Sequence, residues 1–164
     1  MIENLIEKIK KDLGLKQPLR GTTMLTYPIH PEPDTNGTLL ATFPDVPEAV
    51  TFGENEADAK AHAIDALVGM FSSYMDDRRP IPMPTALERR PGVILPVGVA
   101  AKVLLWNVML DAGLRKADLA RTLEVSPTVV DRLLNLSHAS KIEQIETALA
   151  ALGKRLVVDV REAA

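Results

Sequence analysis

The side chains best suited to binding chemistry lie around a short polar turn late in the chain. Their hydroxyl, guanidinium and ammonium groups could donate hydrogen bonds to phosphates or to the edges of bases. A helix beginning at this turn would point its first residues outward, where they could enter a nucleic-acid groove. The candidate contacts are Ser126, Pro127, Thr128 and Arg132, with Lys116 placed near a phosphate.

A second group of candidates is acidic and lies in the first half of the chain. Residues 24–96 contain eleven aspartates and glutamates but five lysines and arginines, a net charge of −6. An acidic face attracts a basic partner and speeds its association, although the same charge could equally keep a small domain soluble. Each acid could instead be a solvated or helix-capping charge, and Asp45, between prolines, could equally form a turn. The candidate partner-binding acids are Asp45, Glu48, Glu54, Glu56 and Asp58.

No combination of side chains forms a recognisable catalytic or metal site. His62 and Asp65 neighbour each other on one expected helical face, but two ligands are too few to hold zinc. The sequence has no cysteine, which excludes disulfides and thiolate ligands. A two-metal nuclease needs converging carboxylates, and the first expected strand, LTYPIH, carries none. We therefore expect no enzyme activity, no cofactor and no metal.

The acidic section predicts a small α+β unit. Asn36-Gly37 is a tight-turn signal between two extended segments. A helix over residues 54–77, with Asn55 able to cap its start, carries an apolar stripe that must pack on a sheet face. That stripe consists of Ile64, Leu67, Val68, Phe71, Tyr74 and Met75. The expected strands span residues 24–31, 38–43, 49–53 and 93–96.

Residues 97–164 predict an all-α unit that ends in a strand. Ser140 can cap the last helix and Gly153 can end it. The final segment, KRLVVDV, alternates in the manner of a strand. The expected helices span residues 97–113 and 140–153, with two short helices within 115–135, and the strand spans 154–160.

The segment from Arg115 to Asn135 is typical of two helices that cross at a tight turn. Ala120 supplies the small side chain that a close crossing requires. Ser126 suits the N-cap of the second helix and Pro127 its first turn. The inner faces are apolar at Leu119, Leu123, Val125, Val130 and Leu133.

This pattern resembles the Cro/repressor-like helix-turn-helix family over roughly residues 103–153, and the resemblance implies DNA binding. Glu124 departs from it, because the turn usually carries a glycine with positive φ, and Asp131 adds a negative charge to the second helix. A bundle used only for dimerisation is the alternative. Residues 97–164 carry a net charge of +1, so we expect operator binding by a homodimer or higher homo-oligomer. Candidate dimer surfaces are the 154–160 strand and the helix around Leu104, Leu105 and Trp106, although Trp106 could equally pack in the core.

The first half resembles the HicB antitoxin family. The family pattern is a strand, then F-x-D-[IVL]-P, a strand ending in Gly-Glu, and an alanine-rich helix. With the helix-turn-helix included, the resemblance covers roughly residues 24–160. The matching residues are Phe43, Asp45, Val46, Pro47, Gly53 and Glu54.

The resemblance implies a type II antitoxin of a HicA/HicB-type system. Its first domain would have a partial ribonuclease H-like fold and cover a HicA-like toxin, a small basic protein that cleaves mRNA with a histidine. Its second domain would bind a palindromic site in its own promoter and repress transcription. An alternative is a transcription factor whose α+β half senses a small ligand or another protein, and a third is an enzyme built on that half.

The expected organisation is a two-domain cytoplasmic protein with an extension at its start. Residues 24–96 would form the toxin-neutralising domain and residues 97–164 the DNA-binding and dimerisation domain. Residues 1–23 carry apolar side chains at helical spacing and form either a helix that packs on the body or an upstream extension. No run of apolar residues is long enough for a membrane span.

Overall fold

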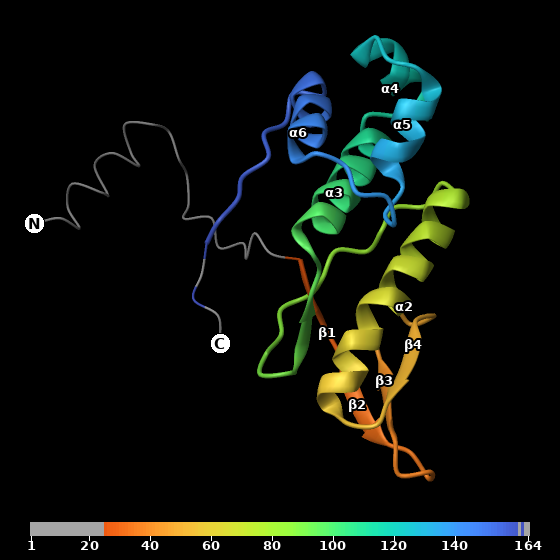
Figure 1. The fold of residues 1–164 in the computed structure, drawn as a ribbon, viewed down its shortest axis with the longest axis vertical. Helices are drawn as coiled ribbons and strands as arrows, with labels where there is room; N and C mark the ends of the chain where they lie inside the picture. The colour runs from red at the N-terminus through yellow and green to blue at the C-terminus, as the bar shows by residue number, and fades with distance from the viewer. Residues whose placement is uncertain (1–24, 161, 163–164) are drawn as a thin grey trace, which may run out of the picture.

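The computed structural model describes residues 25–160 and 162 and has a mixed α+β architecture (Figure 1). Strands come first along the chain and helices follow, which confirms the predicted class. The two interpretations of residues 1–23 lie outside the described residues. The division of the chain near residue 96 and the ribonuclease H-like topology stay predictions.

Two small antiparallel sheets share one extended segment of chain. Strand β1 (Thr26–Pro28) pairs with β5 (Gly92–Ile94). One residue further on, β2 (His30–Pro33) pairs with β3 (Leu39–Thr42), which in turn pairs with β4 (Val50–Gly53). The segment therefore changes its partner at Ile29, whose backbone N–H donates to the carbonyl of Pro91 at 2.9 Å.

The β2–β3 connection is the turn that Asn36-Gly37 predicted. Gly37 has φ of 80°, a conformation that glycine adopts without steric cost. The backbone N–H of Asp34 donates to Thr38 O at 2.8 Å, and the carboxylate of Asp34 accepts from the N–H of Thr35 at 2.7 Å. These local bonds fix the register of the hairpin.

Helix α2 (Glu56–Asp76) covers one face of the three-stranded sheet (Figure 1). Asn55 caps it as predicted, accepting from the N–H of Asp58 at 3.0 Å. Ala59 is also buried and lies against Gly53, where an added Cβ would stand 2.2 Å from Ala59 N. Glycine is thus required where the helix meets β4. Of the predicted stripe, Leu67, Phe71 and Tyr74 are buried, and Ile64, Val68 and Met75 are partly buried.

The proline-rich segment after α2 contains no helix, as predicted, and binds to helix α3 (Val97–Asp111). The indole of Trp106 is 1% exposed and donates from Nε1 to Arg79 O at 2.9 Å. The side-chain amide of Asn107 accepts from the N–H of Ile81 at 2.9 Å and donates to its carbonyl at 2.8 Å. Trp106 therefore belongs to the core, and of its proposed neighbours on the dimer surface Leu105 is also fully buried.

Three further helices complete the chain: α4 (Lys116–Leu123), α5 (Pro127–Leu134) and α6 (Ile142–Ala151). The prediction that Ser140 caps α6 was wrong. Lys141 occupies the N-cap, and the Ser140 hydroxyl faces Arg132 O at 3.4 Å. In the described part of the chain, residues 154–160 form no strand. Their alternation was misleading, because a strand also needs a neighbour that accepts its backbone bonds.

No single helix among the described residues is long and apolar enough to cross a membrane. Only α3 and α4 taken together meet a test of length and composition, and the chain bends by 102° between them.

Candidate functional site

The two helices α4 and α5 meet at a left-handed turn. Glu124 ends α4 with φ of 55° and ψ of 40°, so the position that favours glycine does adopt a positive φ. The N–H of Val125 then donates to Ala120 O at 3.0 Å. Ala120 is 5% exposed where the helices pack together. The two predicted short helices are therefore confirmed, and the helix-turn-helix assignment stays a prediction.

The candidate contacts at the start of α5 face outward. Pro127 is the first helical residue, as predicted, and Thr128 is exposed beside it. Ser126 occupies the N-cap position, but its side chain forms no capping hydrogen bond. Its hydroxyl is therefore not engaged in capping α5. Arg132, on the last turn of the helix, has an exposed side chain as well.

Lys116 at the start of α4 forms an ion pair with α5, and its approach to a phosphate stays a prediction. Its Nζ stands 3.2 Å from Oδ1 of Asp131, and both side chains are at least half exposed. The carboxylate on the second helix thus partly neutralises the ammonium group predicted to approach a phosphate. An exposed pair of this kind contributes little stability, so its main effect is on the charge that α4 and α5 present.

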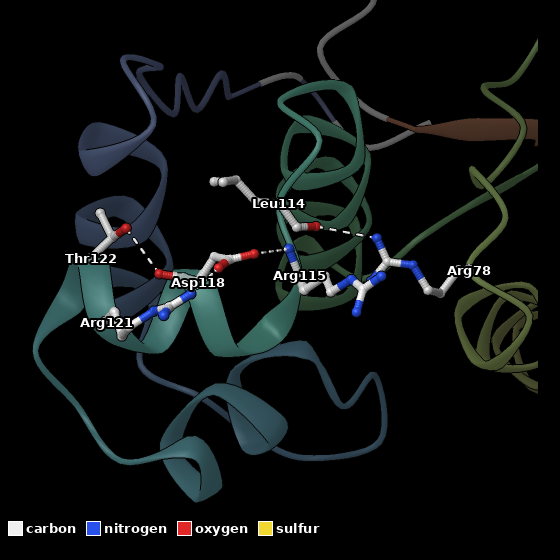
Figure 2. Close-up of polar contacts among 6 residues, drawn as sticks. All are labelled: Arg78, Leu114, Arg115, Asp118, Arg121 and Thr122. Carbon is white, nitrogen blue, oxygen red and sulfur yellow. Dashed lines mark hydrogen bonds and ion pairs between the residues drawn. The ribbon is translucent and has the colours of Figure 1, made fainter.

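The start of α4 is stabilised by contacts within the helix, and the loop before it is contacted by Arg78 (Figure 2). Asp118 accepts from the backbone N–H of Arg115 at 2.8 Å and forms an ion pair with Arg121. These two contacts lower the pKa of Asp118 below its ordinary value. From the end of α2, the guanidinium of Arg78 faces Leu114 O at 3.4 Å. The first half of the chain therefore contacts the loop that leads into α4.

A buried lysine that the sequence reasoning missed holds the end of α5. Lys102 is 2% exposed, and its Nζ donates to the carbonyls of Arg132 at 3.1 Å, Asn135 at 2.6 Å and His138 at 2.5 Å. A cation at a helix C-terminus satisfies carbonyls that have no partner within the helix. Burial lowers the pKa of Lys102, which offsets part of this gain. The available signal was a single charged residue, Lys102, in the largely apolar segment 97–110.

Two of the five candidate acids have structural partners near the end of α2. Asp45 accepts from the N–H of Thr85 at 2.9 Å and from its hydroxyl at 3.2 Å. Glu48 accepts from the hydroxyl of Tyr74 and lies 3.8 Å from Arg79. The hydrogen bond from Tyr74 lowers the pKa of Glu48, and burial with this bond raises the pKa of Tyr74 to about 12.

The other three acids lie at the opposite end of α2. Asp58 accepts from the N–H of Glu54 at 2.9 Å, and Glu56 pairs with Lys60 at 2.7 Å. At a helical rise of about 1.5 Å per residue, Asp58 and Tyr74 stand roughly 24 Å apart along the axis. The five acids therefore do not form one cluster, although Glu54 and Glu56 are exposed.

Within residues 25–160 and 162, no group of three or more histidines and acids could hold a metal ion. His62 donates from Nδ1 to Phe52 O at 2.9 Å, and its Nε2 lies 3.8 Å from Asp58. This imidazole therefore ties α2 to β4.

Comparison with known families gives the class of protein, the antitoxins of bacterial toxin–antitoxin systems. Residues 26–104 match the family model described as a HicB-like antitoxin of a bacterial toxin–antitoxin system. The chain belongs to the HicB antitoxin family. Antitoxins neutralise toxins and are not enzymes, as the sequence led us to expect.

Similar proteins cover most of the chain. Antitoxin HicB 2 of Photorhabdus laumondii subsp. laumondii is 45% identical over 132 residues, 80% of this chain and 94% of the relative. Antitoxin HicB of Pseudomonas fluorescens is 41% identical over 149 residues, 88% of this chain and 100% of the relative. Antitoxin HicB of Escherichia coli K12 is 39% identical over 133 residues, 80% of this chain and 96% of the relative.

Proposed function

We propose that this antitoxin neutralises a small basic toxin of the HicA type by covering its mRNA-cleaving site, and represses its own operon through α4 and α5. The observation that carries the proposal is that one chain contains two different surfaces. A section with a net charge of −6 suits a basic, RNA-binding partner, and a turn-joined helix pair presents outward polar side chains. Both roles belong to a cytoplasmic protein.

Inhibition by occlusion needs no chemistry from the antitoxin. An acidic surface raises the association rate with a basic protein and occupies the positive groups that would otherwise hold RNA phosphates. The test is co-expression of the full chain with the small basic protein encoded beside its gene. We expect growth to be restored and mRNA to stay intact. Failure of the full chain to restore growth would refute the toxin assignment.

Repression requires several copies of the chain. Residues 97–164 have a net charge of only +1, and phosphate neutralisation drives most of the affinity of such modules for DNA. A homodimer or higher homo-oligomer doubles the contacts and matches a palindromic operator. We expect a promoter fragment to bind with an affinity that falls steeply as salt increases.

Arg132 and Asp131 separate DNA reading from simple charge attraction. Arg132→Ala should weaken promoter binding, whereas Arg155→Ala, an equal loss of charge in the exposed tail, should change it little. Asp131→Asn should release Lys116 from its ion pair and tighten binding with a steeper salt dependence. Fluorescence anisotropy across a salt series measures all three variants. An affinity independent of salt, or unchanged in Arg132→Ala, would exclude α5 as the reading helix.

A further inference from the structure

The three-stranded sheet has one covered face and one open face. Alternation along the strands points Ala41, Thr51 and Gly53 toward α2. Figure 1 shows α2 against this side of the sheet. The register aligns the opposite side chains in two rows across the sheet. We call this surface the open face: His30, Glu32, Leu40, Thr42, Val50 and Phe52.

The open face is apolar on its β4 side. Phe52 is 54% exposed and Val50 is 47% exposed, on the strand at the edge of the sheet. Leu40, opposite Phe52 in the register, is half-buried beside them. Half-exposed aromatic side chains that adjoin other apolar groups mark surfaces that bury on association.

The strands and loops around this apolar patch supply acidic side chains and no basic ones. Residues 30–59, which form the whole three-stranded sheet with its loops, contain seven acids and no lysine or arginine. Glu32 lies on the open face, 58% exposed, and pairs with His30 at 2.9 Å. Asp34 follows in the turn and Glu54 comes directly after β4. A basic partner would therefore meet an apolar patch with acidic side chains beside it.

The edge of β4 is less suited to a partner than its face. The outward carbonyl of Phe52 already accepts from His62 at 2.9 Å, so an added strand would find one of its few acceptors in use. We therefore consider contact through the side chains of the open face, with an aromatic anchor in the interface.

We propose that the basic toxin docks on the open face, with Phe52 as its aromatic anchor and Glu32 and Glu54 as acidic contacts. This inference rests on the proposed function, since it names where that partner binds. As proposed toxin contacts, Phe52, Val50 and Glu32 take the place of Asp45 and Glu48. The latter two bind the loop and the helix of their own chain. The open face and α5 lie at opposite ends of the molecule (Figure 1), so both surfaces can be occupied together.

The test titrates the full chain against the basic protein encoded beside its gene, by calorimetry at two salt concentrations. Phe52→Ala should raise Kd at least tenfold, since aromatic anchors dominate such interfaces. Glu32→Lys should raise Kd and reduce the dependence of Kd on salt concentration. Met83→Ala is the matched control, because Met83 is 45% exposed but lies outside the sheet, and it should change Kd less than twofold.

Two further measurements keep the outcomes distinct. Thermal unfolding and promoter binding should match wild type in both face variants, which shows that they remain folded. Kd values within twofold of wild type in both variants would overturn the docking face while leaving the toxin assignment intact. A change in oligomeric state of Phe52→Ala with unchanged Kd would overturn it too, because the face would then join copies of this chain. Absence of binding by wild type would overturn both the docking face and the proposed function.

Discussion

Replacing Lys102 with methionine removes the buried ammonium that holds the end of α5. Methionine keeps most of the length and all of the apolar character of the stem, so packing inside α3 changes little. The variant loses three hydrogen bonds, to the carbonyls of Arg132, Asn135 and His138, at 2.5 to 3.1 Å. The change therefore isolates the contribution of one charge to the position of α5.

The expected loss follows from which carbonyls keep another donor. Arg132 O retains the N–H of Asn135 at 3.3 Å and the hydroxyl of Ser140 at 3.4 Å. Asn135 O retains the N–H of His138 at 3.1 Å. Among the described residues, only the carbonyl of His138 is left without another donor, and a hydrogen bond to a charged group contributes about 1.5–3 kcal/mol. Removing the ammonium also removes the free-energy cost of burying it, which offsets part of the loss. We therefore expect the free energy of unfolding to fall by about 2 kcal/mol.

Urea unfolding followed by fluorescence measures this loss. Trp106 is the only tryptophan and lies one helical turn from Lys102 on α3. A loss of about 2 kcal/mol corresponds to a fall in Tm of roughly 4–8 °C for a chain of this size. Promoter affinity should fall with it, since α5 loses its anchor. Lys141→Met, at an exposed lysine, is the control. A Lys102→Met variant as stable as wild type would show that α5 needs no buried cation.

Substitutions at three other positions test separate features. Glu124→Gly should raise the free energy of unfolding by up to about 1 kcal/mol by relieving the left-handed turn, and Glu124→Val should lower it, both read from urea curves; a stabilised valine variant would refute the strain. Gly53→Ala should lower stability by roughly 2 kcal/mol or more, since its Cβ would stand 2.2 Å from Ala59 N, and an unchanged Tm would contradict this contact. The raised pKa of Tyr74, about 12, contributes stability that is complete below pH 10 and is lost as pH rises from 10 to 12. Tyr74→Phe should lose less stability over that window, and parallel curves for the two proteins would rule out the assignment.

Local signals predicted the elements well. Asn55 as a cap, Asn36-Gly37 as a turn and the stripe of α2 all depend on neighbours within a few residues, and the structure confirms each of them. The alternation at 154–160 failed because strand formation requires a partner from elsewhere in the chain. Ser140 failed as a cap because its hydroxyl faces the carbonyl at the end of α5 instead.

The candidate sites were harder to predict, because the contacts that decide them are distant in sequence. Asp45 is 40 residues from Thr85 and Glu48 is 26 residues from Tyr74. Local spacing cannot show that these acids are already bound within their own chain. Conversely, Phe52 looked like an ordinary strand residue, and only the register and the one-sided cover of α2 reveal its exposure.

Helix α3 contacts both the first half of the chain and α5, and it does so through different side chains. Within six residues it binds the segment after α2 through Trp106 and Asn107, and the end of α5 through Lys102. Of the candidate contacts on α5, Arg132 is touched by Lys102, but through its backbone carbonyl and not through its exposed side chain. The residues of α5 that we propose to contact DNA can therefore be substituted without changing the contacts that hold the helix in place. A chain whose positions 126, 128 and 132 are transplanted from a relative should acquire that relative's operator and still recognise its own toxin.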